Sequence, residues 1–148
     1  FDLFATDHCA FRKADKDDWD GRDVRTVANG LPGVGGLLHH AWRLFADDPD
    51  RAAAEVSLRL SKNPAARLGL DGRKGALREG LDADVVVLDP NGPARPAPGT
   101  ESDAYDAFPG FTSKLALRHV LVHGEPVVRD GELVDAAVRR GQLHPISD

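Results

Sequence analysis

Residues 1–9 form the stretch Phe1-Asp2-Leu3-Phe4-Ala5-Thr6-Asp7-His8-Cys9, in which an apolar run leads directly into polar side chains. The run over residues 1–5 predicts a buried β-strand, and Asp7 would lie at its carboxyl end. In β/α barrels, catalytic side chains lie at these strand ends, because the loops there form a cup above the packed interior. A carboxylate in this place can bind a metal ion and accept a proton. The alternative is that Asp7 only stabilises a turn, since Asp is a favoured turn residue.

The two residues after Asp7 allow several roles. His8 could be a metal ligand, a group that supports a ligand, or a structural hydrogen-bond donor, and a lone histidine is usually structural. Cys9 is the single cysteine of the chain. Such a thiol is more often a small apolar residue of the interior than a nucleophile.

The rest of the sequence divides into two halves by pattern. In residues 1–70, a charged loop is predicted over residues 12–21 and a turn over residues 29–33. Helical spacing follows in two sets, which are Leu37, Leu38, Ala41, Leu44 and Phe45, and then Ala52, Val56 and Leu60. Asn63 and Pro64 predict the start of another short helix, which ends at Gly69.

Residues 71–148 have the pattern of β-structure. A continuous apolar run at residues 85–88 predicts a buried strand, and a loop rich in Pro and Gly follows at residues 90–99. Further strands are predicted within residues 115–122 and 127–129. Asp130-Gly131 is a strong hairpin signal ahead of residues 132–134. The fold class predicted from these patterns is α/β.

Composition excludes several classes of protein. The chain has 148 residues, 41% hydrophobic and 29% charged, with a net charge of −5, which is typical of a soluble globular domain. An acidic balance argues against a sequence-independent nucleic-acid binder, and no apolar stretch approaches the length of a membrane span. One cysteine indicates a reducing compartment, so a cytoplasmic protein is predicted. The chain lacks methionine and starts inside an apolar run, from which we expect it to be a piece of a longer polypeptide.

Four motifs occur in a fixed order: residues 5–11 (ATDHCAF), 29–34 (NGLPGV), 63–70 (NPAARLGL) and 73–90 (RKGALREGLDADVVVLDP). Together they resemble the C-terminal third of the cyclic amidohydrolases, the family of hydantoinase, dihydropyrimidinase, allantoinase and dihydroorotase. Residues 105–110 (YDAFPG) and the terminal hairpin are similar to that family's tail. Dihydroorotases carry a histidine where this chain has Phe11, so the first motif is more similar to hydantoinase or dihydropyrimidinase.

The resemblance implies a metal-dependent β/α (TIM-type) barrel with a small β-sandwich built from both chain ends. Residues 1–70 would be the last strand and helices of the barrel, and residues 71–148 a segment of the sandwich. Asp7 would bind the metal, expected to be zinc, and move a proton during hydrolysis of a cyclic amide such as a hydantoin or a dihydropyrimidine. The backbone at Asn29 and Gly30 would contact the substrate ring, although the same dipeptide could be a plain turn.

The same resemblance implies that essential parts lie outside the chain. A β/α barrel takes about 250 residues, and a catalytic zinc site takes about three protein ligands, of which this chain supplies Asp7. The family's His-x-His pair, carboxylated lysine and two further histidines would lie upstream. The chain alone is therefore expected to be inactive.

The expected partners are a small-molecule substrate and either further copies of the chain, as a homo-oligomer, or the remainder of the barrel. Nucleic acid and membrane are not expected partners. Two alternatives stay open: a non-catalytic assembly or interaction module that lacks the ligand set, and a free-standing β-rich binding domain that shares local motifs.

Overall fold

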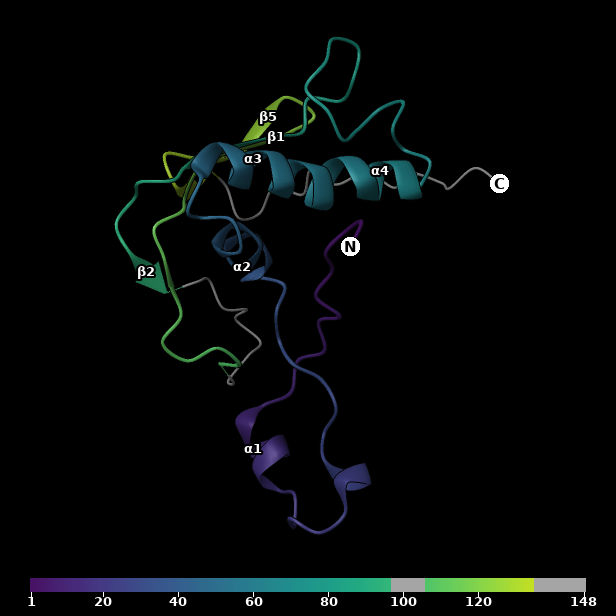
Figure 1. Cartoon of the computed structure of the whole chain (residues 1–148), viewed down its shortest axis with the longest axis vertical. Coiled ribbons are helices and arrows are strands. Elements are labelled where there is room, and N and C mark those ends of the chain that lie inside the picture. The colour runs from purple at the N-terminus through teal and green to yellow at the C-terminus, as the bar shows by residue number, and fades with distance from the viewer. Residues whose placement is uncertain (97–105, 135–148) are drawn as a thin grey trace.

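The computed structural model describes residues 1–96 and 106–134 (Figure 1). Helices and a sheet pack together, and an arm of the chain, residues 6–34, extends away from them (Figure 1). The helices are α1 (Lys13–Asp17), the 3-10 helix η1 (Val24–Thr26), α2 (Leu37–Arg43), α3 (Pro49–Ser57), the π-helix η2 (Leu58–Lys62) and α4 (Asn63–Arg67). The strands are β1 (Val85–Asp89), β2 (Arg95–Pro96), β3 (Thr112–Ser113), β4 (Ala116–Val122), β5 (Glu125–Arg129) and β6 (Glu132–Leu133). None of the helices in this described part is long and apolar enough to span a membrane.

The predicted strand over residues 1–5 is not formed. These residues have no regular secondary structure, and Phe1 is fully exposed. A strand needs a neighbouring strand for its backbone groups, and the neighbours of this segment are helical. The Phe4 amide donates to the Arg59 carbonyl at 3.3 Å, and the Asn63 side chain donates to the Asp2 carbonyl. The segment is therefore attached to the helices through its backbone rather than paired in a sheet.

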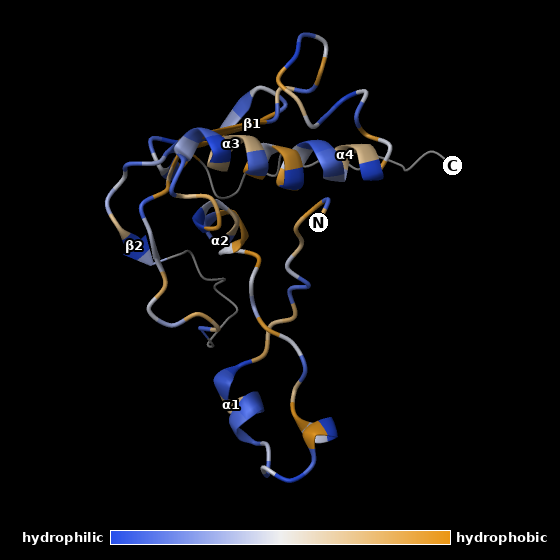
Figure 2. Ribbon diagram, in the orientation of Figure 1, coloured by the Kyte–Doolittle hydropathy of each residue, from blue (hydrophilic) through white to orange (hydrophobic). Residues whose placement is uncertain are grey.

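The predicted charged loop over residues 12–21 contains the helix α1. Asp15 accepts from the Arg12 amide at 3.0 Å and from the Arg12 guanidinium at 2.8 Å, which stabilises the first turn. Lys16 donates to the Ala28 carbonyl at 2.8 Å and so connects α1 to the returning limb of the arm. No side chain of α1 is buried, and the helix is hydrophilic (Figure 2).

The helix after residue 48 is continuous to residue 67. Asp48 begins it, because its carboxylate accepts from the amides of Asp50 and Arg51 at 3.1 Å. α4 begins at Asn63 as predicted, but it continues the preceding helix instead of starting a separate one, because Asn63 has helical backbone angles and is not a cap. Pro64 lacks an amide and would crowd the carbonyl four residues earlier. The helix widens to a π turn just before it, where the Asn63 amide donates to the Leu58 carbonyl.

Helices and sheet share one hydrophobic core. Its buried residues are Ala41 and Trp42 of α2, Ala52 and Val56 of α3, and Leu115 before β4. Partly buried apolar residues pack around them, namely Phe4, Leu38, Phe45, Leu60 and Leu88. The predicted shared face of Ala52 and Val56 is confirmed, since they are 0% and 7% exposed, whereas Leu44 of the other predicted set is 65% exposed. Because the core draws on both halves of the chain, the helices and the sheet stabilise each other.

The sheet has the strand order β1-β4-β5-β6, and all its pairs are antiparallel. β2 and β3 form a separate ribbon. The predicted hairpin at Asp130-Gly131 is confirmed, with φ of 52° and 86° at the two residues. His123 and Gly124 form a matching turn between β4 and β5, with φ of 51° and 80°. Two successive residues with positive φ suit the right-handed twist of a hairpin.

The prediction that the run at residues 85–88 is a buried strand was only partly right. β1 forms at this place, but it is the edge of the sheet, with β4 as its one neighbour among the described residues. Val86 is 53% exposed and Val87 is 41% exposed. Successive residues of a strand point to opposite faces, so both faces of β1 are partly open.

Candidate functional site

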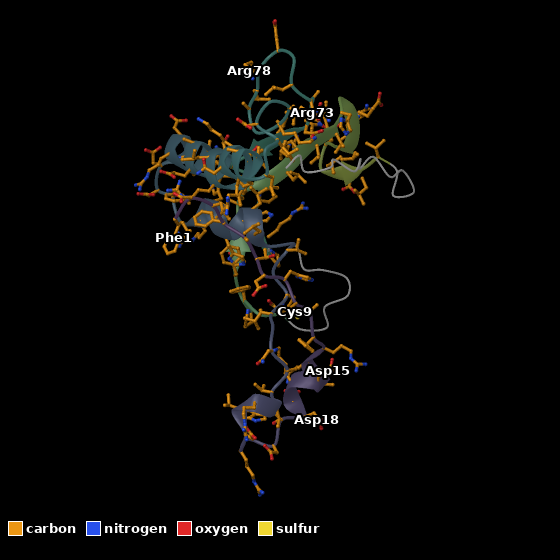
Figure 3. The ribbon with its side chains drawn as sticks, turned by 90° about the vertical axis from the view of Figure 1, so that its right-hand side faces the viewer. Phe1, Cys9, Asp15, Asp18, Arg73 and Arg78 are labelled. Carbon is orange, nitrogen blue, oxygen red and sulfur yellow. The ribbon has the colours of Figure 1, made fainter. Side chains whose placement is uncertain are left out.

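Two motifs that the sequence separates by about twenty residues lie side by side in the arm. The Cys9 amide donates to the Leu31 carbonyl at 3.1 Å, and the Cys9 thiol lies 3.6 Å from the Asn29 carbonyl. Cys9 lies partway along the arm, between the core and the tip that carries Asp15 and Asp18 (Figure 3). The structure therefore brings the segment around Asp7 into contact with the segment that contains Asn29 and Gly30.

Asp7 lies at a sharp turn of the backbone. Its φ is 47°, in the left-handed region, which Asp tolerates better than most residues. Thr6 supports the turn, because its hydroxyl accepts from the His8 amide at 3.2 Å. The Asp7 carboxylate is exposed, and no hydrogen bond or ion pair engages it within residues 1–96 and 106–134. This carboxylate is therefore accessible for chemistry.

His8 makes a contact that the sequence did not predict. Its Nδ1 accepts from the Gly33 amide at 3.0 Å and lies 3.3 Å from the Val34 amide. One of the three roles considered from sequence was a structural donor, whereas in the structure Nδ1 is an acceptor. The hydrogen-bonded turn follows directly, where the Gly36 amide donates to the Gly33 carbonyl at 3.2 Å. This turn lies just after the predicted one at residues 29–33.

A glycine is required at residue 30 because the backbone there lies very close to Cys9. A Cβ atom added at Gly30 would lie 2.6 Å from the Cys9 Cβ and 2.7 Å from the Cys9 carbonyl oxygen. Its φ of 133° is also one that L-residues rarely adopt. The Asn29 side chain is exposed. The Asn-Gly pair is thus part of a contact between two limbs of the arm, and the plain turn considered as an alternative is not formed at these residues.

Comparison with known proteins identifies the family. A family model described as the amidohydrolase family matches residues 21–128, which is more than half of the chain. The chain belongs to the amidohydrolase family. The predicted membership of the cyclic amidohydrolases is confirmed.

Curated relatives of this amidohydrolase include D-phenylhydantoinase of Escherichia coli O81 (strain ED1a), 34% identical over 143 residues. That match covers 93% of this chain and 30% of the relative, and the enzyme of E. coli O1:K1 gives the same figures. Among solved structures, a D-hydantoinase (dihydropyrimidinase) from Thermus sp. superposes with a TM-score of 0.75 at 27% identity. It is covered to 29% of its length, by 90% of this chain. A second D-hydantoinase gives a TM-score of 0.76 at 28% identity, with 90% of this chain and 30% of that one covered. The chain thus spans about 30% of the length of these relatives, and its mixed α/β structure is like that part of the solved hydantoinases.

The part of this amidohydrolase that the structure describes does not form a metal site on its own. Over residues 1–96 and 106–134, no three His, Cys, Asp or Glu side chains lie close enough to hold a metal ion. His40 and His119 lie elsewhere: His40 packs against Phe108 and Phe111 at 4.4 and 4.1 Å between ring centroids. His119 accepts from the Asp130 amide at 3.3 Å. A catalytic zinc site takes about three protein ligands, and Asp7 alone does not meet this requirement.

The motif at residues 73–90 forms a clasp that sequence reasoning did not predict. Lys74 contacts Asp82 at 3.0 Å and also pairs with Asp84. Asp84 accepts from the His123 amide at 2.8 Å, which attaches the clasp to the turn between β4 and β5. Figure 3 shows Arg73, a neighbour in this motif, well away from Cys9. We define the clasp as Lys74, Asp82 and Asp84.

Charge pairing in the clasp shifts the pKa of each member. The hydrogen bond from Lys74 lowers the pKa of Asp84 and likewise that of Asp82. The hydrogen bond to Asp84 is the largest cause that raises the pKa of Lys74. The clasp therefore keeps its charged form over a wider range of pH than separate side chains would.

Proposed function

We propose that this chain is the C-terminal part of a metal-dependent hydrolase that cleaves a C–N bond in a cyclic amide, such as a hydantoin or a dihydropyrimidine. Family membership and the printed names of the relatives support the reaction class. One structural observation supports the placement of the site: the accessible carboxylate of Asp7 lies on a segment bonded to the segment of Asn29 and Gly30.

In this proposal each site residue has a defined role. Asp7 takes up and returns a proton at its carboxylate during cleavage of the amide, because an amide nitrogen leaves poorly unless it is protonated. The backbone of Asn29 and Gly30 offers hydrogen-bonding groups to the ring, and the absence of a side chain at Gly30 lets this segment pack against Cys9. The metal, expected to be zinc, would polarise the amide carbonyl. Asp7 would supply one of its ligands, and the others would come from outside this chain.

The proposal extends to the architecture of the whole protein. Residues 1–70 would belong to a β/α barrel, and residues 71–148 would contribute a segment of a small β-sandwich. The edge strand β1 supports this view, because among the described residues its outer side has no neighbouring strand and its backbone groups there can pair with a further strand. Assembly into a homo-oligomer and a cytoplasmic location belong to the same proposal.

Two measurements test the proposed function. The reading frame around the chain should encode an upstream His-x-His pair and a lysine, and its product should hydrolyse a hydantoin or dihydrouracil. The 148-residue chain alone should bind no stoichiometric zinc by plasma mass spectrometry. A flanking sequence without the histidine pair and the lysine, or a full product inert toward both substrates, would overturn the proposal. Stoichiometric zinc in the chain alone would show that the metal site has been misplaced.

A second candidate is a non-catalytic assembly module of the amidohydrolase type. The observation in its favour is that the described residues supply a single site carboxylate and no ligand cluster. Light scattering after size exclusion distinguishes the two ideas in part. A stably folded monomer with no partner would contradict the assembly module.

A further inference from the structure

The imidazole of His8 connects the two limbs of the arm through a nitrogen that accepts hydrogen bonds. The Gly33 amide lies 3.0 Å and the Val34 amide 3.3 Å from Nδ1. A ring nitrogen that accepts from backbone amides carries no proton, so the neutral ring has its proton on Nε2. Nδ1 of His8 therefore holds the backbone of Gly33 and Val34, and Nε2 lies on the opposite side of the ring.

We propose that His8 is a positioning residue for substrate binding, which holds residues 29–34 in place relative to Asp7. This inference rests on the proposed function. His8 directly follows Asp7, so the ring is anchored at the turn that carries the candidate catalytic carboxylate. Through Gly33 and Val34 it fixes the end of the segment that begins with Asn29 and Gly30.

Cys9 and His8 hold different parts of the segment of residues 29–34. Cys9 fixes the middle of the same segment through the hydrogen bond of its amide to the Leu31 carbonyl. Without the His8 ring, the segment would keep its contacts at Cys9 but would lose both contacts near Gly33. The expected effect is on substrate affinity, because the residues affected bind the ring and do not themselves react.

The experiment uses two variants of the full protein, in each of which the new side chain has an amide in the place of one of the two ring nitrogens of His8. The Oδ1 atom of Asn in His8→Asn can take the place of Nδ1, whereas the amide of Gln in His8→Gln reaches toward the place of Nε2. One readout is hydrogen exchange at the Gly33 and Val34 amides by mass spectrometry. The other is the separate measurement of KM and kcat for hydantoin and dihydrouracil. His119→Gln is the control, since His119 also accepts a backbone amide but lies in the sheet.

We expect both amides to be protected in the unmodified protein and in His8→Asn, and to exchange about tenfold faster in His8→Gln. KM should rise about tenfold in His8→Gln, with kcat within about threefold, and His8→Asn should recover most of the affinity. His119→Gln should change neither readout. His8 is exposed, so these substitutions remove no buried volume and the variants should fold, which a melting curve checks.

Three results would overturn the inference. The first is free exchange of the Gly33 and Val34 amides in the unmodified protein, which needs no variant to be seen. The second is equal behaviour of His8→Asn and His8→Gln in exchange and KM. The third is a lower KM and slower exchange in His8→Gln than in His8→Asn, which would mean that Nε2, and not Nδ1, is the atom that matters. Failure of the proposed function looks different: the unmodified protein would hydrolyse neither substrate, while exchange still decides the role of Nδ1.

Discussion

The core and the arm of this amidohydrolase are held together by different forces. Within the described residues, the buried hydrophobic side chains other than Pro32 lie outside the arm, in α2, α3, α4 or the sheet region. In the arm several large apolar side chains are exposed to solvent, with Trp19 at 41%, Val24 at 70% and Val34 at 53% exposure. Figure 2 shows that the strand β1 is hydrophobic and the helix α1 is hydrophilic.

This contrast places the candidate site in the less packed of the two regions. The core is stabilised by burial of apolar surface, which is non-directional and tolerates exchange of similar residues. The arm is stabilised by hydrogen bonds with defined partners, such as those of His8 and Cys9. Loss of a single partner in the arm should therefore affect the geometry of the site more than the stability of the chain.

The largest effect is expected for Asp7→Asn in the full protein, which should lower kcat by a factor of about 10²–10⁴ or more. Asn tolerates the left-handed backbone at this residue, so the fold should be unchanged. Asparagine cannot take up the proton, and it binds a metal more weakly than a carboxylate does. Asp2→Asn is the matched control, because it removes an exposed carboxylate from the same segment without touching the turn. Near-normal turnover in Asp7→Asn would remove Asp7 from the mechanism.

A pair of tryptophans tests the difference in packing directly. Trp42 is 8% exposed in the core, so Trp42→Ala should lower the free energy of unfolding by about 3–5 kcal/mol. Trp19 is 41% exposed, and its Nε1 donates to the Asp23 carbonyl at 3.0 Å. Trp19→Ala should cost about 1 kcal/mol, mostly from that hydrogen bond.

Urea unfolding followed by circular dichroism measures both tryptophan variants. The comparison of core and arm would fail if the two substitutions cost the same. A larger loss for Trp19→Ala would mean that the arm, and not the core, limits the stability of the chain.

Two glycines of the arm separate steric contact from backbone strain. Both Gly30 and Gly21 have positive φ, but a Cβ at Gly21 would meet nothing within 4 Å. Gly21→Ala should therefore cost about 1 kcal/mol of strain. Gly30→Ala adds overlap with Cys9 and should cost about 1–3 kcal/mol more, along with weaker substrate binding. Melting curves and KM values for both variants test this, and equal effects would contradict the close approach seen at Cys9.

Sequence signals that are local in the chain predicted local structure well. The spacing of Ala52 and Val56 predicted their shared buried face, and Asp130-Gly131 predicted a hairpin, because periodicity and turn chemistry act over a few residues. The motifs of Asp7 and Asn29 were found by their resemblance to a family. Their mutual contact through Cys9 agrees with a common site.

Features that depend on distant neighbours were not predictable from the same signals. The apolar residues 1–5 look like a strand, but a strand forms only beside another strand, and here the neighbour is Arg59. Asn63-Pro64 resembles a helix start, yet the helix before it supplies the Leu58 carbonyl and continues. The partner of the His8 ring lies 25 residues away at Gly33, and no spacing rule connects the two.

The smallest expected effect concerns charge, and it compares the clasp with an ion pair of the arm. The pKa of Asp84 is lowered from 3.8 by Lys74, so its contribution to stability is present above pH 3.8 and is lost as the pH falls through its lower folded value. The pKa of Lys74 is raised from 10.5, so its contribution is present below pH 10.5 and is lost as the pH rises further. The clasp should therefore stabilise the chain fully between these limits.

Lys74→Met should flatten the loss of stability as the pH falls below 3.8, because the pKa of Asp84 then lies closer to its ordinary value. Lys13→Met removes the same charge from the pair with Asp17 in the arm, where the side chains are 64% and 59% exposed. Water screens such a pair, so this control should leave the acid branch unchanged. Urea unfolding at a series of pH values compares the three proteins. If Lys74→Met and the unmodified chain lose stability in the same way as the pH falls, the charges of the clasp do not contribute to folding. In this respect the core and the arm would then be alike.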